Sequence, residues 1–240
     1  MAAIDRSRPI VGVGMKMYLG HAGSLRYLAE LAEAAPRLAA ASVFVLPSFP
    51  VLAEARDVLR GSGIAHGAQD GHWEDSGPHT GSVSPAMLAE LGCSLVEVGH
   101  AERRRDFGED DAMTARKAAG AAGAGLVPIV CVGENENGDG AETAVAAQLR
   151  PVLAALPAAA EVVIAYEPVW AIGADRPAPP DHVAGVLGAI RAETDAPVLY
   201  GGAVAPGQIA AILAAGADGV FASRSALTLP GLEAIVEEVA

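Results

Sequence analysis

The chain has 240 residues, of which 52% are hydrophobic and 19% charged, and its formal net charge at pH 7 is −13. So much apolar material excludes an intrinsically disordered chain, and the length suits one large domain better than two. The acidic excess argues against a general nucleic-acid partner or an anionic membrane, so any anionic ligand must be held by local features.

The chain holds two cysteines, Cys93 and Cys131. Both lie in apolar runs and cannot form a disulfide framework, so we expect two buried free thiols and a reducing cytoplasm. The N-terminus makes a poor signal peptide because charged residues precede its short apolar run. The longest uncharged apolar stretch, 118–133, is shorter than the roughly 20 residues of a membrane span. We therefore expect a soluble cytoplasmic protein without a membrane partner.

Short β-rich runs alternate with helical stretches along the whole chain. The predicted strands cover residues 10–15, 42–46, 64–69, 94–99, 126–132, 161–166, 197–200 and 219–222. The predicted helices cover residues 24–40, 51–60, 85–91, 112–124, 142–156, 180–193, 206–215 and 232–239. Several strands are apolar without alternation, which is typical of strands that are covered on both faces in a parallel sheet.

A strand followed by a helix, eight times over, favours an α/β protein with a single (β/α)8 TIM barrel that spans residues 1–240. The competing fold is a doubly wound open sheet, which usually has fewer strands and a glycine-rich first turn. The string GMKMYLG after the first predicted strand lacks the pattern G-x-G-x-x-G. The barrel is therefore the preferred prediction.

In such a barrel all strands end on one face, where active sites are built. The residues at or just after the predicted strand ends are Lys16, Pro47, Gln69, His100, Glu134, Glu167, Gly201 and Ser223. A lysine, a histidine and a glutamate therefore converge on one rim. Together with the glycines after the sixth and seventh strands, they indicate proton-transfer chemistry on a phosphorylated substrate.

Several segments resemble motifs of the triosephosphate isomerase family. AYEPVWAIG at 165–173 is similar to the family's signature, and VEVGHAERR at 96–104 is similar to its fourth-strand motif. TGSVSPAMLAELG, PIVCVGE and YGGAV match in order and spacing, so the resemblance covers essentially the whole chain. It implies an aldose–ketose isomerase of glycolysis and gluconeogenesis that works through an enediolate, with neither a cofactor nor a metal.

The resemblance also assigns roles to individual residues. Glu167 is the implied base, His100 the electrophile and proton shuttle, and Lys16 the cation at the substrate oxygen and phosphate. Glu102 is expected to contact Lys16, and Arg103 to be structural. A base and a donor to the carbonyl are what enolisation requires. The other histidines, expected at the surface or in loops, are His21, His66, His72, His79 and His182.

The phosphate is expected to bind backbone N–H groups and helix N-termini of the last loops. The predicted contacts are Gly173, Gly202, Ala203, Ser223 and Arg224. The Arg224 guanidinium offers either a bidentate phosphate contact or a salt bridge between helices. The predicted lid is the loop 168–178, which contains Pro168, Trp170 and Pro177. Pro177 restricts the backbone and is expected to stiffen the C-terminal hinge of this lid.

A turn-rich loop, DGHWEDSGPHTG at 70–81, follows the third predicted strand. By resemblance it inserts into the partner subunit of a homodimer, with Thr80 near the partner's Lys16 and Trp73 as an anchoring aromatic. The spacing of the histidines in and before this loop matches no compact zinc site, so no metal is expected.

Some residues around the substrate depart from the family's usual pattern. After the first strand the family usually has Asn-Trp-Lys-Met-Asn, whereas Gly14 and Met15 precede Lys16 here. Serines are replaced by Ala101 and Ala203, and two glycines by Ser223 and Arg224. The first candidate reaction is dihydroxyacetone phosphate to glyceraldehyde 3-phosphate. The second is isomerisation of a tetrulose (erythrulose) phosphate, and a non-catalytic barrel that binds a sugar phosphate is the alternative of another class.

Overall fold

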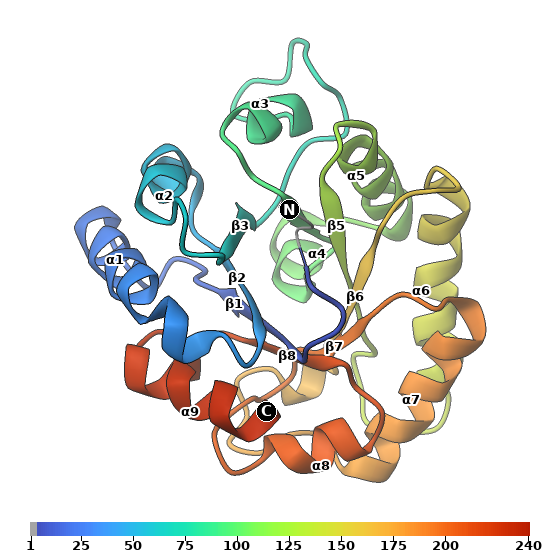
Figure 1. The fold of residues 1–240 in the computed structure, drawn as a ribbon. Coiled ribbons are helices and arrows are strands. Elements are labelled where there is room, and N and C mark those ends of the chain that lie inside the picture. Colours follow the sequence, from blue (N-terminus) through green and yellow to red (C-terminus); the bar gives the residue numbers. More distant parts are fainter. Residues whose placement is uncertain (1–3) are drawn as a thin grey trace.

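The computed structural model describes residues 4–240. Eight parallel strands form a closed barrel in chain order, in which β8 pairs with β1, so the predicted (β/α)8 barrel is confirmed (Figure 1). The strands are β1 (Ile10–Gly14), β2 (Ser42–Leu46), β3 (Ala65–Ala68), β4 (Leu95–Val98), β5 (Val127–Val132), β6 (Val163–Tyr166), β7 (Val198–Tyr200) and β8 (Gly219–Ala222). Each matches a predicted strand to within two residues at either end.

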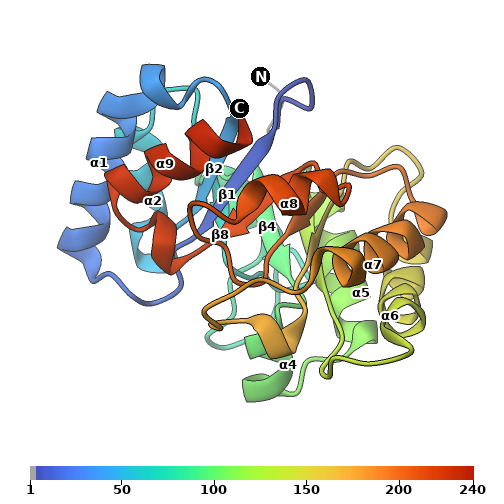
Figure 2. The same ribbon diagram turned by 90° about the horizontal axis from the view of Figure 1, so that it is seen from below.

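Helices surround the barrel (Figures 1 and 2). They are α1 (His21–Leu38), α2 (Leu52–Val58), α3 (Pro85–Glu90), α4 (Ala101–Phe107), α5 (Asp111–Gly123), α6 (Ala141–Ala155), α7 (Pro180–Glu193), α8 (Ile209–Ala214) and α9 (Leu229–Val239). Three short 3-10 turns are η1 (Phe49–Val51), η2 (Val169–Ala171) and η3 (Arg224–Ala226). Within residues 4–240, no helix is both long and apolar enough to cross a membrane.

The sequence analysis missed α4, whose sequence AERRRDF has no apolar face and contributes no buried residue. The helix is defined by its ends instead. The His100 side chain accepts a hydrogen bond at the N-terminus, and Gly108 closes the C-terminus in the left-handed conformation with φ 68°. In Figure 2, α4 lies at the end of the barrel opposite the N terminus, where the strands finish.

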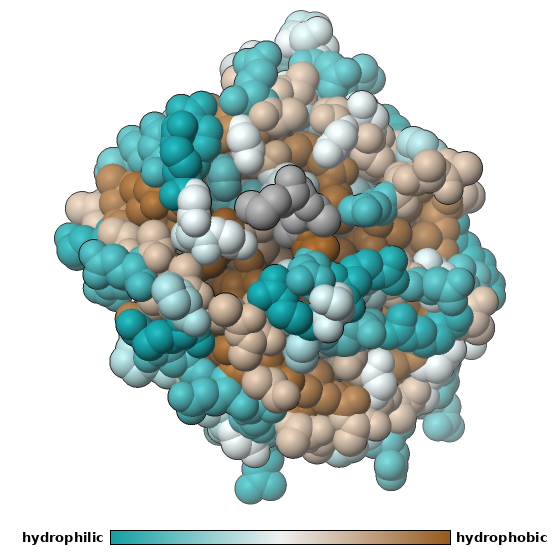
Figure 3. Space-filling view, in the orientation of Figure 1, coloured by the Kyte–Doolittle hydropathy of each residue, from teal (hydrophilic) through white to brown (hydrophobic). Residues whose placement is uncertain are grey.

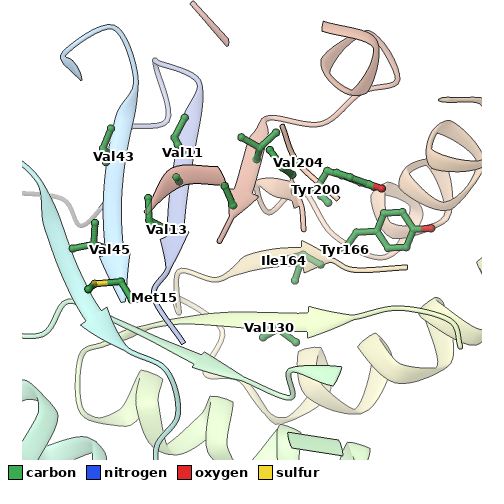
Figure 4. Packing of buried hydrophobic residues seen from close by; sticks show 14 of the residues in the cluster. Val11, Val13, Met15, Val43, Val45, Val130, Ile164, Tyr166, Tyr200 and Val204 are labelled. Carbon is green, nitrogen blue, oxygen red and sulfur yellow. The ribbon is translucent and has the colours of Figure 1, made fainter. Parts of the chain in front are cut away.

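The strands are apolar on both faces because each face is buried. Alternate residues of a strand point to opposite sides. Val11 and Val13 of β1, together with Val43 and Val45 of β2, face the helices and belong to the buried layer shown in Figure 4. The surface in Figure 3 is different, since hydrophilic side chains there surround smaller hydrophobic patches.

The other strand face fills the inside of the barrel. Its buried apolar side chains include Ile10, Phe44, Leu95, Ile129 and Phe221. The rings of Phe44 and Phe221 pack with centroids 5.7 Å apart. They fit because Gly12 leaves them room, since a Cβ at this position would lie 2.3 Å from the Phe44 ring. The barrel is therefore a packed core, and its site must lie at a rim.

Candidate active site

Side chains that follow β1, β4 and β6 meet at the carboxyl end of the barrel. Lys16 Nζ donates a hydrogen bond to Glu102 Oε1 at 2.7 Å. Glu102 Oε2 lies 3.6 Å from His100 Nδ1, and His100 Nε2 lies 3.6 Å from Glu167 Oε1. The structure thus brings the lysine, the histidine and both glutamates of the sequence prediction into one chain of contacts.

Lys16 is held in an unusual backbone conformation. Among the described residues it is the only non-glycine residue with a positive φ, at 47°. Its carbonyl oxygen accepts hydrogen bonds from Ser48 Oγ at 2.9 Å and from Gln69 Nε2 at 3.0 Å. Two neighbouring strand ends therefore fix the turn that carries this lysine. Gln69, predicted only as a strand-end residue, supports that turn.

The charge of Lys16 is secured by the acids around it. Burial alone would lower the pKa of this lysine, but the hydrogen bond and charge of Glu102, with the charges of Glu167 and Glu97, outweigh burial and raise the pKa. Lys16 is therefore an ammonium ion throughout the neutral range. It supplies local positive charge to a chain whose net charge is strongly negative.

His100 is buried and oriented by the start of α4. Its Nδ1 accepts a hydrogen bond from the backbone N–H of Glu102 at 3.0 Å. Burial, reinforced by the charge of Lys16, lowers the pKa of His100 to about 4. The ring is therefore neutral at pH 7. Because Nδ1 is an acceptor, the proton of the neutral ring is on Nε2, which faces Glu167.

Glu167 follows β6 and is placed by two glycines. A Cβ on Gly133 would lie 1.8 Å from the carbonyl oxygen of Glu167, and a Cβ on Gly201 would lie 2.8 Å from its Cγ. The backbone N–H of Glu167 donates to Val132 O at 2.8 Å. Glycine at both neighbouring strand ends therefore allows this carboxyl to pack down at the rim.

The surroundings of Glu167 make it a strong base. It is 4% exposed, and its Oε2 has no hydrogen-bond partner among the described residues. Burial raises the pKa of Glu167 well above the usual range for a glutamate, and the charge of Glu97 raises it further, while Lys16 opposes both. A carboxylate in this position has a free oxygen and a high affinity for a proton.

The loop after β6 is tied to a residue whose role the sequence analysis missed. Glu134 Oε1 accepts hydrogen bonds from Trp170 Nε1 at 2.7 Å, from His182 at 2.9 Å and from the Tyr166 hydroxyl at 3.2 Å. The expectation that His182 is a surface or loop residue was therefore wrong, because it lies in α7 and turns inward to this carboxylate. The only sequence signal was the position of Glu134 at a strand end.

The far end of the same loop is anchored separately. The backbone N–H of Ala178 donates to the hydroxyl of the buried Tyr200 at 2.8 Å. Pro177 directly precedes this anchor and is half-buried, whereas residues 173–176 are exposed. The loop thus has two fixed ends and an exposed centre, as a lid requires.

The loops after β6, β7 and β8 lie close together. Arg224 Nη2 donates to Gly173 O at 3.2 Å, so the guanidinium joins two loops, and within residues 4–240 it forms no salt bridge between helices. Ser223 Oγ is buried and lacks a hydrogen-bond partner among the described residues. Gly202 and Ala203 are half-buried in the loop after β7, which is joined to the loop after β8 by a hydrogen bond from Ser225 Oγ to Val204 O at 2.6 Å. The predicted phosphate contacts are thereby brought to one place at the mouth of the barrel.

Comparison with known proteins identifies the family. The triosephosphate isomerase family model matches residues 9–239. The chain belongs to the triosephosphate isomerase family. An L-erythrulose-1-phosphate isomerase of Pectobacterium atrosepticum is 39% identical, covering 95% of this chain and 94% of the relative. A triosephosphate isomerase of Herpetosiphon aurantiacus is 41% identical, covering 86% and 89%. An L-erythrulose-1-phosphate isomerase of Rhizobium etli is 39% identical, covering 95% and 91%.

The resemblance stated from the motifs is therefore confirmed, and the chain is an isomerase of this family. The family's established scheme pairs a carboxylate base with a neutral histidine, which is the pairing that Glu167 and His100 present here. The relatives carry two different substrate names, so the family assignment leaves the substrate of this chain open.

In this triosephosphate isomerase family member, Arg103 supports the base of the loop 70–81. Its guanidinium contacts Asp70 at 3.0 Å and Glu109 at 2.7 Å. Buried Lys117 contacts the same two carboxylates at 2.7 and 2.6 Å. Two cations therefore hold two acids under the loop, in keeping with a structural role for Arg103.

The rest of that loop is mostly exposed, including Thr80. Trp73 packs on its own chain, with the Arg116 guanidinium 4.0 Å above its ring. His72 stacks on Trp73 with centroids 4.1 Å apart. The expectation that His66 is a surface or loop residue was wrong, because it is buried in β3.

Proposed function

We propose that the protein is an isomerase that moves the carbonyl of a short phosphorylated ketose to the neighbouring hydroxyl-bearing carbon. The observation that carries this proposal is the approach of a buried carboxyl, Glu167, to within 3.6 Å of the neutral imidazole of His100, with the Lys16 ammonium beside them. A strong base and a hydrogen-bond donor that face the same small space can remove a proton from the carbon next to a carbonyl and stabilise the carbonyl oxygen.

In the proposed reaction, Glu167 takes the proton from the carbon next to the ketose carbonyl. Nε2–H of His100 donates to the carbonyl oxygen, and Lys16 stabilises the negative charge that develops there. The enediolate then receives the proton from Glu167 on the former carbonyl carbon, and the carbonyl ends on the carbon that lost its proton. Dihydroxyacetone phosphate would thereby give an aldose. A tetrulose 1-phosphate would give an isomeric ketose, because its C1 carries the phosphate ester and cannot become an aldehyde. His100 moves the proton between the two oxygens. Each group ends in its starting state.

The phosphate is proposed to bind the backbone N–H groups of Gly173, Gly202 and Ala203 and the free hydroxyl of Ser223. Arg224 is exposed, and its bond to Gly173 O is exchangeable, so the guanidinium is available for a bidentate phosphate contact. Closure of the loop 168–178 over this anion would exclude water from the enediolate.

Of the two candidate substrates, we place the tetrulose phosphate first. Gly14, two residues before Lys16, lacks the amide side chain that the family usually has there. A Cβ on Gly14 would make only ordinary contacts, the nearest at 3.6 Å from the Phe221 ring, so no larger neighbour forces the glycine. The two erythrulose-phosphate isomerases reported above align with 95% of the chain. Triose phosphate is the second candidate, since other relatives of similar identity carry that name.

The test compares kcat/KM on purified L-erythrulose 1-phosphate and dihydroxyacetone phosphate. We expect kcat/KM to be at least about tenfold higher for the four-carbon substrate, because contacts to one additional carbon of a substrate change kcat/KM by about that factor. A higher value for the triose would make it the substrate. Binding of both without turnover of either would instead identify a non-catalytic sugar-phosphate-binding barrel.

We further propose that the enzyme is a cytoplasmic homodimer. The two cysteines are free and buried, as predicted, which suits a reducing compartment. Met17 and Tyr18, next to Lys16, are 92% and 53% exposed in one chain, and the tip of the loop 70–81 is exposed as well. Sedimentation equilibrium is expected to give twice the mass of one chain for the wild type. Met17→Glu is expected to reduce the measured mass to that of a single chain.

A further inference from the structure

A second carboxyl lies inside the barrel beside the proposed base, and the isomerisation scheme does not use it. Glu97 belongs to β4, two residues after Leu95, and shares the strand face that points into the barrel. It is 6% exposed. An ionised carboxylate in this position lowers the stability of the fold, because a buried charge is poorly solvated. Its presence there calls for an explanation.

The neighbours of Glu97 are Cys131 of β5 and Glu167. One donor atom from each of the three side chains lies within 4.8 Å of the other two. Cys131 Sγ–H donates to Glu97 Oε1 at 3.5 Å. The thiol is thus enclosed between two carboxyl groups, and no cation lies inside this cluster of described side chains.

Two carboxyl groups this close cannot both be charged at low cost, so the pair retains a proton to higher pH than free glutamates do. Burial raises the pKa of Glu97 to about 8, against the opposing charge of Lys16. Burial and the charge of Glu97 also raise the pKa of Glu167. The charged or titratable groups that act on Glu97 are Lys16 after β1, Asp70 after β3, Glu102 on α4, Cys131 on β5 and Glu167 after β6.

The proposed reaction decides which carboxyl holds the proton, since a base must be ionised to accept one. We propose that Glu97 is a positioning residue that carries the proton of this pair, so that Glu167 remains ionised while the pair holds a single negative charge. This inference rests on the proposed function. The same three atoms would also suit a divalent cation, but a cation there would occupy the carboxylate that has to take the substrate proton.

The consequence is an alkaline limit to activity. Once Glu97 ionises, its charge lies beneath an anionic ester and a developing enediolate, which it repels. In the wild type, kcat/KM is therefore expected to fall above about pH 8. The pKa of the substrate phosphate lies near 6 and affects only the acidic side of the profile, equally in every variant.

The test is the pH profile of kcat/KM in the wild type, Glu97→Gln and Glu97→Asp. Glutamine copies the shape of a protonated glutamate but cannot ionise. We expect Glu97→Gln to keep activity at pH 7 within roughly fivefold and to stay flat over the alkaline range in which the wild type falls. Glu97→Asp retains a carboxyl and should retain the alkaline fall.

An unchanged alkaline fall in Glu97→Gln, or its absence in the wild type, would overturn the proposal and leave Glu97 with a packing role only. Activity that a chelator abolishes would also overturn it, since the cluster would then be a metal site.

A second measurement is independent of turnover. Infrared difference spectra of the wild type between pH 7 and pH 9.5 should show the loss of one buried protonated carboxyl, which Glu97→Gln lacks. If neither ketose phosphate reacts but this band is present, the proposed function fails while the shared proton stands. If Glu97→Gln does not fold, the wild-type spectrum remains as the test. The absence of a protonated-carboxyl band that is lost between pH 7 and pH 9.5 would contradict the proposal.

Discussion

The barrel has two buried regions of different character, an apolar interior and an ionisable cluster at the carboxyl end of its strands. In the apolar region, Phe44 and Phe221 pack over Gly12 with no polar atom to satisfy. In the ionisable region, His100 and Glu167 are equally buried, yet the Glu167 carboxyl has an oxygen without a partner among the described residues. The first region stabilises the fold, and the second trades stability for chemistry. Substitutions in the two regions should therefore affect different quantities.

The largest expected effect is in the apolar region. Phe44→Ala should lower the free energy of unfolding by about 3–5 kcal/mol, because it leaves a cavity in a packed core. Denaturant unfolding measures this change, and kcat/KM of the folded fraction should stay close to that of the wild type. The matched control is Phe107→Ala, because Phe107 is 68% exposed. This variant should lower the free energy of unfolding by less than about 1 kcal/mol. Equal losses in both variants would contradict the assignment of the core.

The next effect is in the ionisable region. His100→Gln should lower kcat/KM by roughly 10²-fold, which is the usual size of a lost general acid. His21→Gln is the control, because that histidine is exposed and its side chain hydrogen-bonds only Glu54 among the described residues. Steady-state assays with the ketose phosphate that gives the higher kcat/KM would measure both variants. Equal activity of both variants would remove His100 from the mechanism.

His100 also gives a pH dependence of stability. Its folded pKa, about 4, lies below the ordinary histidine value of 6.5. Between these values the unfolded chain binds more protons, so the free energy of unfolding contributed by this group falls as the pH drops from about 6.5 to about 4. His100→Gln should lack that part of the fall. Parallel curves for the two proteins would contradict a neutral His100.

A smaller effect is expected at the mouth of the barrel. Arg224→Ala should raise KM roughly tenfold with little change in kcat, because it removes a charged hydrogen bond to the phosphate in both ground and transition states. Arg60→Ala removes the same charge from an exposed site that is 74% accessible, and should leave KM unchanged. If KM stays constant in Arg224→Ala, the guanidinium serves only to join its loop to Gly173.

The smallest effect is expected at the lid hinge. Pro177→Ala should change kcat by less than about threefold, since alanine fits the same backbone and only relaxes it. Relaxation dispersion should detect more motion at the C-terminal hinge, next to Ala178. Pro206→Ala, in another exposed loop, is the control. A hinge that is already as mobile as the loop centre in the wild type would contradict the stiffening role of Pro177.

The sequence was most informative where the physics is local or repetitive. Short β-rich runs predicted all eight strands, and several of these runs, such as VVIAY, are apolar throughout because both faces of the strand are buried. Helix α4 was missed because its residues have no apolar periodicity, and only its cap residues define it. Glu167, His100 and Lys16 were predicted as site residues because each ends a strand and lies in a motif.

The rest of the site depends on contacts between distant segments. Glu97 lies in the short strand LVEV, where a single acid forms no recognisable sequence pattern. Its proposed role depends on Cys131 and Glu167, which come close to it only in the folded barrel. Glu134 acquires its role from Trp170 and His182, which are brought to it only by folding.

The central claim is that Glu167 takes a proton from the carbon beside the carbonyl. The most direct measurement is NMR of the ketose phosphate and its product after incubation with enzyme in D2O. The wild type should place deuterium on that carbon, and Glu167→Gln, with an unchanged circular dichroism spectrum, should do so roughly 10³-fold more slowly. Exchange at the wild-type rate in Glu167→Gln would contradict the claim.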